Sequence, residues 1–450
     1  MKWFLSLLAI AAAAHSIRAA GPEFDWAISA GGKLHDKVRG LAVDPSGNIL
    51  LTGEFTGEAA FGDIQLKAAG SMDFFVAKVS PEGKFLWARS GGGSKIDRGY
   101  AVATDNQGNC VVTGHFESAD AVFGTHKPQL AGDYDAFAAK YDARGELVWF
   151  QAFGGKGYDY GHGVGTDAAG NAVVTGALAG DGMLAGQPIG EQGPARMFAI
   201  KFDPAGKVAW HRVATGKGNS TGHGIAVDRA GNSFVGGAHG GPGSLAGTEF
   251  GAKPGRDILV AKIDPTGKVT WIHDGFSSDS AMAHEICADE TGRVWVSGMF
   301  KGKLKTGMGE QASQGDSDLL VAALDSSGKR LWTKTAGGPK IDYGLGVATD
   351  GNGNAFLTGS FTGKVRFGDR ELDSGAASDI FVAGLDPKGE ILLLLQATGK
   401  ATDHAYTIAH HRGYLYLSGA CSGEARFGDK TLANRGSNDI FLARVRLAPR

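Results

Sequence analysis

A unit of 60 to 62 residues recurs seven times along this chain, and this period constrains the fold more than any other feature of the sequence. Gly-Asn pairs mark it at positions 47–48, 108–109, 170–171, 231–232 and 353–354, and Gly292-Arg293 and Gly413-Tyr414 complete the series. The same register returns in Asp73, Asp135, Arg196, Asp257, Asp318, Asp379 and Asp439, each followed by an apolar run. Because such repeats bury their apolar faces against one another, seven copies predict one continuous array rather than several separate domains.

Each repeat contains four strand-like runs joined by tight turns. In the second repeat the runs span residues 100–104, 110–114, 136–141 and 147–152. The first two strands are joined by Asp-x-x-Gly-Asn, as in Asp105 to Asn109, and the last two by turns such as Asp203 to Lys207. Asp caps such a turn and Gly supplies a positive φ, so two hairpins per repeat account for these residues without calcium loops.

A Trp in the fourth strand shows how the array ends. It stands at positions 87, 149, 210, 271 and 332, with Leu393 in its place in the sixth copy. Trp87 lies 14 residues after Asp73, and the same step from Asp439 leads to position 453, beyond Arg450. Trp26 instead lies 61 residues before Trp87, with matching neighbours. We therefore predict an all-β, seven-bladed β-propeller of four-stranded blades, with the ring closed by the N-terminal strand.

These motifs resemble a known family, the bacterial β-propeller repeat often abbreviated SBBP. Its unit reads roughly Ala-Val-Asp-x-x-Gly-Asn, Thr-Gly, Gly-x-x-Asp-x-Phe-Val-Ala-Lys and Gly-x-x-x-Trp, and residues 41–48, 52–53, 73–78 and 83–87 match it. The resemblance covers nearly all of the chain after residue 20 and implies a propeller fold and export, without a particular activity. Departures at Arg196, Ser220, Ala281 and Leu393 indicate that blades 3 to 6 are specialised or have drifted.

The first 20 residues have the layout of a secretory signal peptide, with Lys2, an apolar stretch from Trp3 to Ala14 and small residues up to Ala20. The apolar stretch is too short for a transmembrane helix. We therefore expect a secreted or periplasmic protein without membrane insertion, in which residues 21–450 form a single propeller domain. The formal net charge of -2 offers no basic surface for nucleic acid, and we expect a monomer.

Two further sets of residues are interpreted as structural. Asp residues open the segment between blades at positions 36, 97, 159, 342 and 403, and others precede the third strand, where carboxylates commonly bond to backbone amides. Cys110, Cys287 and Cys421 fall in three different repeats. Three cysteines cannot all pair within one chain, so we expect buried free thiols.

The candidate site lies three residues after the Asp that opens each segment between blades. That position holds Arg39, Tyr100, His162, His223, His284, Leu345 and Tyr406. We expect it to begin the innermost strand, at the mouth of the central channel on the face with the long loops. Three adjacent blades offer a His there, although the chain has only 13. The imidazoles can bond to neighbouring carbonyls or to Asp159 and Glu285, form a polar ligand site, or ligate a metal.

Three classes of function fit this pattern. The sequence has no nucleophile elbow, His-Glu-x-x-His or phosphate loop, which favours an exported non-catalytic binding or scaffold propeller that recognises an extracytoplasmic protein or a glycan through its loop-rich face. The alternative is a metal-assisted lyase or hydrolase, with His162, His223 and His284 as ligands and Tyr100 or Tyr406 moving a proton. Residues 325–332 also resemble the Trp-docking repeat of quinone-cofactor dehydrogenases, which usually have eight blades and paired adjacent cysteines. No cofactor is assigned, and a divalent metal is the remaining candidate.

Overall fold

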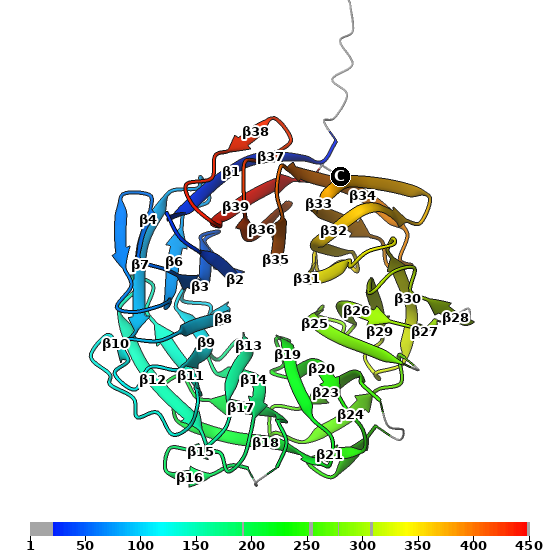
Figure 1. Cartoon of the computed structure of the whole chain (residues 1–450). Coiled ribbons are helices and arrows are strands. Elements are labelled where there is room, and N and C mark those ends of the chain that lie inside the picture. The colour runs from blue at the N-terminus through cyan, green and yellow to red at the C-terminus, as the bar shows by residue number, and fades with distance from the viewer. Residues whose placement is uncertain (1–20, 191–192, 252–254, 278, 307–308, 448–450) are drawn as a thin grey trace, which may run out of the picture.

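The computed structural model describes residues 21–190, 193–251, 255–277, 279–306 and 309–447. Over these ranges the chain consists of strands, turns and loops, and seven four-stranded blades surround a central channel (Figure 1). The prediction of an all-β, seven-bladed propeller is therefore confirmed. The predicted signal peptide, residues 1–20, lies outside the described residues, and the extent of the domain over residues 21–450 stays a prediction.

Each blade is an antiparallel sheet of four strands. We number the blades 1 to 7 in chain order and give the strands of each blade from the one that lines the channel to the outermost one. They comprise β2 (Lys37–Val43), β3 (Ile49–Phe55), β6 (Asp73–Val79) and β7 (Phe85–Gly92); β8 (Asp97–Thr104), β9 (Cys110–Phe116), β11 (Asp135–Tyr141) and β12 (Leu147–Gly154); β13 (Tyr160–Thr166), β14 (Ala172–Leu178), β17 (Arg196–Phe202) and β18 (Val208–Gly216); β19 (Ser220–Val227), β20 (Ser233–His239), β23 (Asp257–Ile263) and β24 (Val269–His273); β25 (Ser280–Ala288), β26 (Val294–Lys301), β29 (Asp318–Leu324) and β30 (Arg330–Ala336); β31 (Tyr343–Thr349), β32 (Ala355–Phe367), β33 (Arg370–Leu385) and β34 (Ile391–Gly399); and β35 (Asp403–His411), β36 (Tyr414–Cys421), β39 (Asp439–Arg446) and β1 (Glu23–Gly32).

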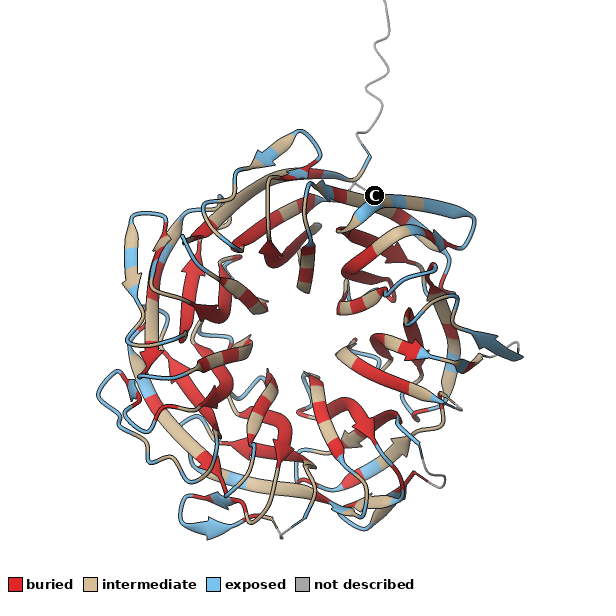
Figure 2. Ribbon diagram, viewed as in Figure 1, coloured by how far each residue is buried: buried red, intermediate tan, exposed pale blue. Residues whose placement is uncertain are grey.

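The hydrophobic core is divided into seven clusters, each lying between two adjacent blades. The cluster between blades 1 and 2, for example, packs Phe74 and Trp87 against Phe116 and Phe137. Strands β3, β6, β9 and β11 are buried along their whole length (Figure 2). Because both faces of each blade are covered, these strands read as continuous apolar runs rather than as alternating patterns.

The repeated Trp also joins neighbouring blades. Trp87 Nε1 donates to the carbonyl oxygen of Ala143 in blade 2 at 3.1 Å. The same bond to the following blade is made by Trp149, Trp210, Trp271 and Trp332. Gly145, with φ at +82°, lies under the ring, and a Cβ there would stand 2.7 Å from Cδ2 of Trp87. The Trp therefore fills the space between two blades. Its ring leaves no room for a side chain on the turn glycine of the next blade.

The ring closes where β1 pairs with β39, as Trp26 predicted (Figure 1). The antiparallel ladder runs over residues 23–30 opposite residues 440–446, with one irregularity near residue 25. The first described strand of the chain thus becomes the outermost strand of blade 7. This pairing removes the edge that blade 7 would otherwise expose.

Arg444 reinforces the closure from the C-terminal side. Its Nε donates to Asp25 Oδ2 at 2.8 Å, and its Nη1 donates to the carbonyl oxygen of Pro81, in blade 1, at 2.7 Å. The guanidinium also lies over two aromatic rings, 5.3 Å from the centroid of Trp26 and 4.5 Å from that of Tyr414. One side chain therefore ties β39, β1 and the next blade together.

Short hairpins occupy the long connections between the second and third strands, where the sequence predicts only loops. In blade 1, β4 (Glu58–Phe61) pairs with β5 (Ile64–Lys67) and with β1 of blade 7. Other blades carry β10 (Val122–Phe123), β15 (Met183–Leu184) with β16 (Gln187–Pro188), β21 (Gly243–Leu245) with β22 (Thr248–Phe250), β27 (Lys303–Thr306) with β28 (Gly309–Ala312), and β37 (Ala425–Phe427) with β38 (Lys430–Leu432). Strands β4, β10, β15, β21 and β37 each extend the outer edge of the preceding blade. Strands this short show no clear alternation of apolar and polar residues, and the outer strands that they extend belong to the preceding repeat, so the sequence alone did not predict them.

The cysteines are free thiols, as expected. Cys110 and Cys421 are buried and Cys287 is partly buried. Among the described residues, no helix has the length and apolar character needed to span a membrane.

Deletion of residues 21–32 is expected to open the ring, because it removes the whole β1 ladder together with the buried side chains of Phe24 and Ala30. The truncated protein should aggregate or melt at a much lower temperature than the wild type, and a synthetic peptide of residues 21–32 should restore part of the loss. Size-exclusion chromatography with light scattering and thermal unfolding measure both effects. A control substitution, Glu23→Ala at the exposed start of β1, should change little, and a truncated monomer of unchanged melting temperature would contradict closure.

Candidate functional site

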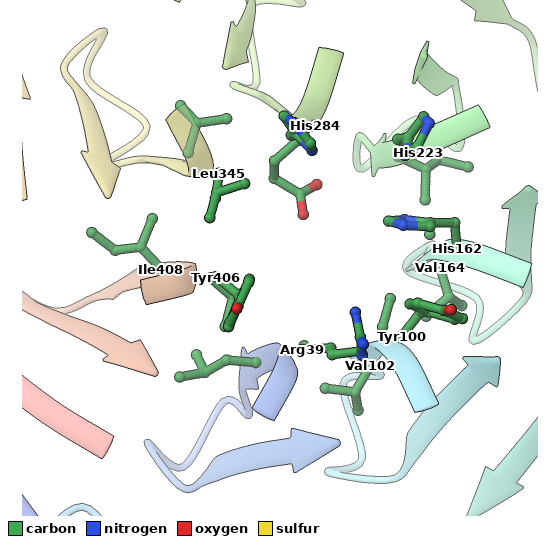
Figure 3. A pocket seen from close by; sticks show the side chains of 18 residues that line it. Arg39, Tyr100, Val102, His162, Val164, His223, His284, Leu345, Tyr406 and Ile408 are labelled. Carbon is green, nitrogen blue, oxygen red and sulfur yellow. The ribbon is translucent and has the colours of Figure 1, made fainter. Parts of the chain in front are cut away.

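The residues singled out by the repeat meet around the central channel (Figure 3). These ring residues, one from the innermost strand of each blade, are Arg39, Tyr100, His162, His223, His284, Leu345 and Tyr406. Together with apolar side chains such as Val102, Val164 and Ile408 they line a cavity of about 360 Å³. The cavity lies inside the channel along the middle of the innermost strands; in Asp97–Thr104, for example, the lining runs from Tyr100 to Val102. These strands begin on the loop-rich face, which carries the segments between blades and the hairpins.

Each ring residue is the extra residue of a β-bulge. In β8 the register with β9 shifts between Gly99 and Ala101, so that Tyr100 has no partner on β9. A bulge bends its strand and re-aims the side chain, which explains how seven different residues come to line one cavity. The expectation that the innermost strand begins at these residues is wrong. In blade 2 it begins at Asp97, because the residues before the bulge still pair with β9.

The position after each ring residue is Gly or Ala in five blades, where neighbouring innermost strands approach closely, and Thr407 in blade 7. A Cβ on Gly40 would lie 2.7 Å from the Cα of Ala101 in the next blade. Blade 5 is the exception, and Glu285 lines the cavity from this position. Its Oε1 would lie 2.8 Å from a Cβ on Gly224 of blade 4. Burial raises the pKa of Glu285 to about 7, so the cavity holds a carboxyl group that is partly protonated at neutral pH.

Five ring residues form a continuous stack along the cavity wall, from blade 1 to blade 5. The Arg39 guanidinium lies 4.9 Å from the ring centroid of Tyr100, which stacks on His162 at 4.8 Å and 19° between planes. The ring centroids of His162 and His223 are 4.5 Å apart, and those of His223 and His284 are 6.1 Å apart, both in edge-to-face geometry. We call these five side chains the mouth arc. It presents aromatic faces and ring nitrogens side by side.

Positive charge at the mouth comes from blade 1. Arg39 Nε donates to Glu54 Oε2 at 2.6 Å; the Glu54 side chain is 1% exposed and that of Arg39 is 22% exposed. Burial acts to lower the pKa of Arg39, but the charge of Glu54 and the hydrogen bond outweigh it and raise the pKa. Lys37 Nζ lies 4.0 Å from the ring centroid of Tyr406, and burial lowers the pKa of Lys37 to about 8. Both side chains therefore remain cationic at neutral pH.

The three histidines of the mouth arc are neutral at physiological pH. Burial lowers the pKa of His162 to about 3 and of His284 to about 4, and it lowers the pKa of His223 well below its usual value, with nearby imidazoles and arginines acting in the same direction. A neutral imidazole both donates and accepts a hydrogen bond. Thr221 Oγ1 bonds to His223 Nε2 at 3.1 Å, whereas no hydrogen-bond partner is found among the described residues for His223 Nδ1 or His284 Nε2.

The two carboxylates that the sequence suggested as partners of the imidazoles, Asp159 and Glu285, accept hydrogen bonds from backbone amides. Asp159 accepts hydrogen bonds from the backbone amides of Gly155 and Ala179, at 2.7 and 2.5 Å. Glu285 accepts a bond from the amide of Ile286 at 3.1 Å. Among the residues that the structure describes, no group of three or more His, Cys, Asp or Glu side chains is arranged to hold a metal ion.

A chain of ring contacts, which we call the aromatic path, runs from the mouth arc through the buried His115 to the surface. Ring centroids are 5.5 Å apart between Tyr100 and His115, 4.5 Å between His115 and Tyr134, and 4.9 Å between Tyr134 and Tyr158, which is 56% exposed. The sequence analysis missed this path, because the two outer tyrosines lie in different blades and meet through a bridge between them. A signal was available, since each tyrosine immediately precedes an Asp of the repeat register.

No model of a known protein family matches the chain. An uncharacterized WD repeat-containing protein of Acanthamoeba polyphaga mimivirus is 24% identical over 231 residues, which cover 43% of this chain and only 17% of that protein's length. This relative supports the propeller fold, whereas membership of the SBBP family stays a prediction.

Several solved structures are similar at low identity. The Pan2 WD40 domain of Neurospora crassa is 10% identical, with 78% of this chain and 89% of that chain covered and a TM-score of 0.39. The endosialidase of phage phi92 is 10% identical, with 95% and 70% covered and a TM-score of 0.42. A gluconolactonase of Xanthomonas campestris is 13% identical, with 76% and 95% covered and a TM-score of 0.31. Similarities at these scores carry no information about ligand or activity.

The imidazoles of His162, His223 and His284 are expected to show no protonation between pH 5.5 and 8, because burial lowers all three pKa values below this range. NMR titration of protein labelled at histidine measures this directly, with single His→Gln variants for assignment and an appended histidine tag as an internal titrating control. Titration of any of the three near its ordinary pKa would contradict the closed, desolvated geometry of the cavity.

Glu285→Gln is expected to stabilise the protein at alkaline pH. Because the folded pKa of Glu285 is raised to about 7, its contribution is fully present below the unfolded pKa and is lost as the pH rises through 7. The variant should exceed the wild type by about 1 to 3 kcal/mol in free energy of unfolding at pH 8, and the difference should vanish near pH 4. Denaturant unfolding at several pH values measures it, with Glu290→Gln at an exposed position of blade 5 as the control.

Proposed function

We propose that this protein is an exported, non-catalytic binding propeller that recognises a protein or a glycan through its loop-rich face, with the channel mouth as the centre of the site. One observation carries the proposal. The mouth arc and the aromatic path form a continuous series of rings from the exposed Tyr158 to His284. The mouth arc at the inner end of this series lines a cavity of about 360 Å³. A cavity lined by apolar surface with a few convergent polar groups is typical of a binding site.

The chemistry of the wall indicates which group enters. Neutral imidazoles and the phenols of Tyr100 and Tyr406 offer hydrogen bonds without fixed charge, and aromatic faces offer apolar contact. Arg39 and Lys37 add positive charge on one side, and Glu285 adds a partly protonated carboxyl group on the other. These features favour a polar group with several hydroxyl or amide functions and at most a weak negative charge. A sugar unit of a glycan has this chemistry, as does a polar side chain presented by a protein.

Binding at the mouth fits the way the site is built. The ring residues lie outside the strand ladders, at bulges, so a partner can contact them without disturbing the blades. The surrounding loop-rich face is broad enough for contacts beyond the cavity, and repeat architectures commonly use such faces. Export and a secreted or periplasmic location are part of the proposal, supported by the leader-like first 20 residues and by the resemblance to exported propeller repeats.

The double variant His162→Ala/His223→Ala should lose binding while keeping the fold. Wild-type protein, this variant and the control Val148→Ala, at an exposed outer-strand position, are applied to a glycan array and used as bait for extracellular proteins. Ligands retained by the wild type and the control but released by the double variant are then titrated by calorimetry. We expect at least a tenfold loss of affinity in the double variant, and Tyr158→Ala should cause a smaller loss.

Loss of stability in the double variant with all binding retained would overturn the assignment of the mouth as the site. Elemental analysis of the purified wild type addresses the enzymatic alternative. Metal bound in equimolar amount by the wild type and lost in the double variant would favour the metal-assisted lyase or hydrolase over the binding module.

A further inference from the structure

Two sets of aspartates that recur in the repeat register meet where adjacent blades touch on the loop-rich face, and we call each such meeting a seam. One Asp begins the third strand of a blade, and the other opens the innermost strand of the next. Between blades 1 and 2 they are Asp73 and Asp97, and the residues just before them, Met72 and Ile96, form a parallel bridge. The amide of Asp97 donates to the carbonyl oxygen of Met72 at 2.9 Å, which fixes the two Asp backbones next to each other.

A glycine at the end of the outermost strand leaves room for both carboxyl groups. A Cβ on Gly92 would lie 2.7 Å from Asp97 Oδ2 and 2.8 Å from Asp73 Oδ1. The equivalent distances at Gly154 are 2.9 Å to Asp159 Oδ2 and 2.7 Å to Asp135 Oδ1. The two carboxyl groups of a seam therefore point at the same small space.

Their hydrogen bonding is unequal. Asp97 Oδ2 accepts bonds from the amide of Gly93 at 2.8 Å and the hydroxyl of Ser118 at 2.7 Å. The carboxyl group of Asp73 accepts bonds from the amides of Ala69, at 2.9 Å to Oδ2, and Gly70. Its Oδ1, which lies beside Gly92 on the side of Asp97, has no hydrogen-bond partner among the described residues. The same oxygen lacks a partner at four seams in the part of the chain that the structure describes, in Asp73, Asp135, Asp318 and Asp439. All four side chains are at most 3% exposed.

The remaining seams serve as natural comparisons. Between blades 3 and 4 both aspartates are replaced, by Arg196 and Ser220, and the Ser220 hydroxyl accepts a bond from the amide of Met197 at 3.0 Å. Between blades 4 and 5 the second aspartate is replaced by Ala281. Asp257 there accepts bonds through Oδ1 from two amides, at 2.8 and 3.0 Å.

Between blades 6 and 7 both aspartates are present, as Asp379 and Asp403, but both oxygens of Asp379 have donors, Gln396 Nε2 at 2.6 Å and the amide of Gly399 at 3.1 Å. Among the described residues the unpartnered oxygen thus occurs only at seams with two aspartates, and at four of these five.

A buried carboxylate oxygen without a donor, aimed at a second carboxyl group, is costly unless a proton lies between them. We propose that each of these four seams is a proton-binding site in which the two aspartates share one proton, carried on the unpartnered oxygen and donated to the facing carboxylate. No bond other than O–H forms or breaks, and the proton comes from solvent. The propeller is thereby held together more tightly in mildly acidic than in alkaline solution.

The surroundings of the seams act in the same direction. Burial raises the pKa of both aspartates at each of the four seams. It raises the pKa to about 6 for Asp73 and, at the other three seams, for the facing aspartates Asp36, Asp159 and Asp342. The other charged groups facing Asp73 and Asp97 are Asp120 and Glu117, with Lys95 and Arg98 beside Glu117. A folded pKa above the unfolded value means that the stability from the shared proton is fully present below about pH 4 and is lost as the pH rises through about 6.

The substitution Asp73→Asn tests the proposal, because an amide donates to Asp97 at every pH as the protonated acid would. At pH 8 the variant should melt about 1 to 3 °C above the wild type, and at pH 4.5 the two should melt together. The control is Asp105→Asn in a hairpin turn, where burial acts to raise the pKa of Asp105 but the bonds from Asn109 and Lys140 outweigh it and lower the pKa. This variant should lose stability, and lose more at pH 8 than at pH 4.5.

Infrared spectroscopy gives a readout that does not depend on variant stability. Wild-type protein at pH 5.5 should show the C=O stretch of buried protonated carboxyl groups, and Asp73→Asn/Asp135→Asn should show about half of this signal at the four seams. An equal melting-temperature loss at both pH values in Asp73→Asn, together with an unchanged infrared band, would overturn the proposal. A rise in the wild-type melting temperature at pH 8 on adding calcium ions, absent in Asp73→Asn, would also overturn it and assign the seam to a cation.

Discussion

Each blade of this protein buries its faces only against its two neighbours, and the fold depends on this shared burial. The seven hydrophobic clusters all lie between blades, so every blade needs both neighbours present. An open row of blades would leave two apolar faces and a strand edge in water. The pairing of β1 with β39, backed by the contacts of Arg444 with Asp25 and Pro81, is therefore the condition under which the other six interfaces persist.

The sequence predicted what the repeat carries in every copy. The repeat period predicted the number of blades, and Trp26 predicted the closing strand. The position three residues after the opening Asp predicted the cavity wall from Arg39 to Tyr406. What escaped prediction depends on contacts between copies. The hairpins pair with a neighbouring blade, and Tyr134 meets Tyr158 only across a seam. The bulges escaped because the innermost strand was expected to begin at the ring residue. The preceding glycines, such as Gly99 and Gly161, which mark a bulge inside a strand, were therefore placed outside it.

The seams and the cavity are linked through the backbone. The Asp that opens each innermost strand, such as Asp36, fixes the chain by accepting bonds from the amides of Gly32 and Thr56, and Arg39 follows three residues later. In blade 3, Asp159 and His162 have the same relation. In the five blades that have this Asp, the polar contacts between blades thus fix the backbone three residues before the ring residue. Blades 4 and 5, which lack this Asp, nevertheless place His223 and His284 on the wall, because their strands keep the bulge.

The bulges have a consequence for how such a protein changes over generations. A residue in a strand ladder is constrained by partners on both sides, but a ring residue has none across the sheet, and its side chain lines the cavity. Arg, Tyr, His and Leu all occupy the same position of otherwise similar blades. Selection can therefore exchange one residue of the cavity wall at a time and change the binding specificity while the blades stay the same. Duplication of a single blade would also copy its ring residue, which is one route to histidines at this position in three consecutive blades.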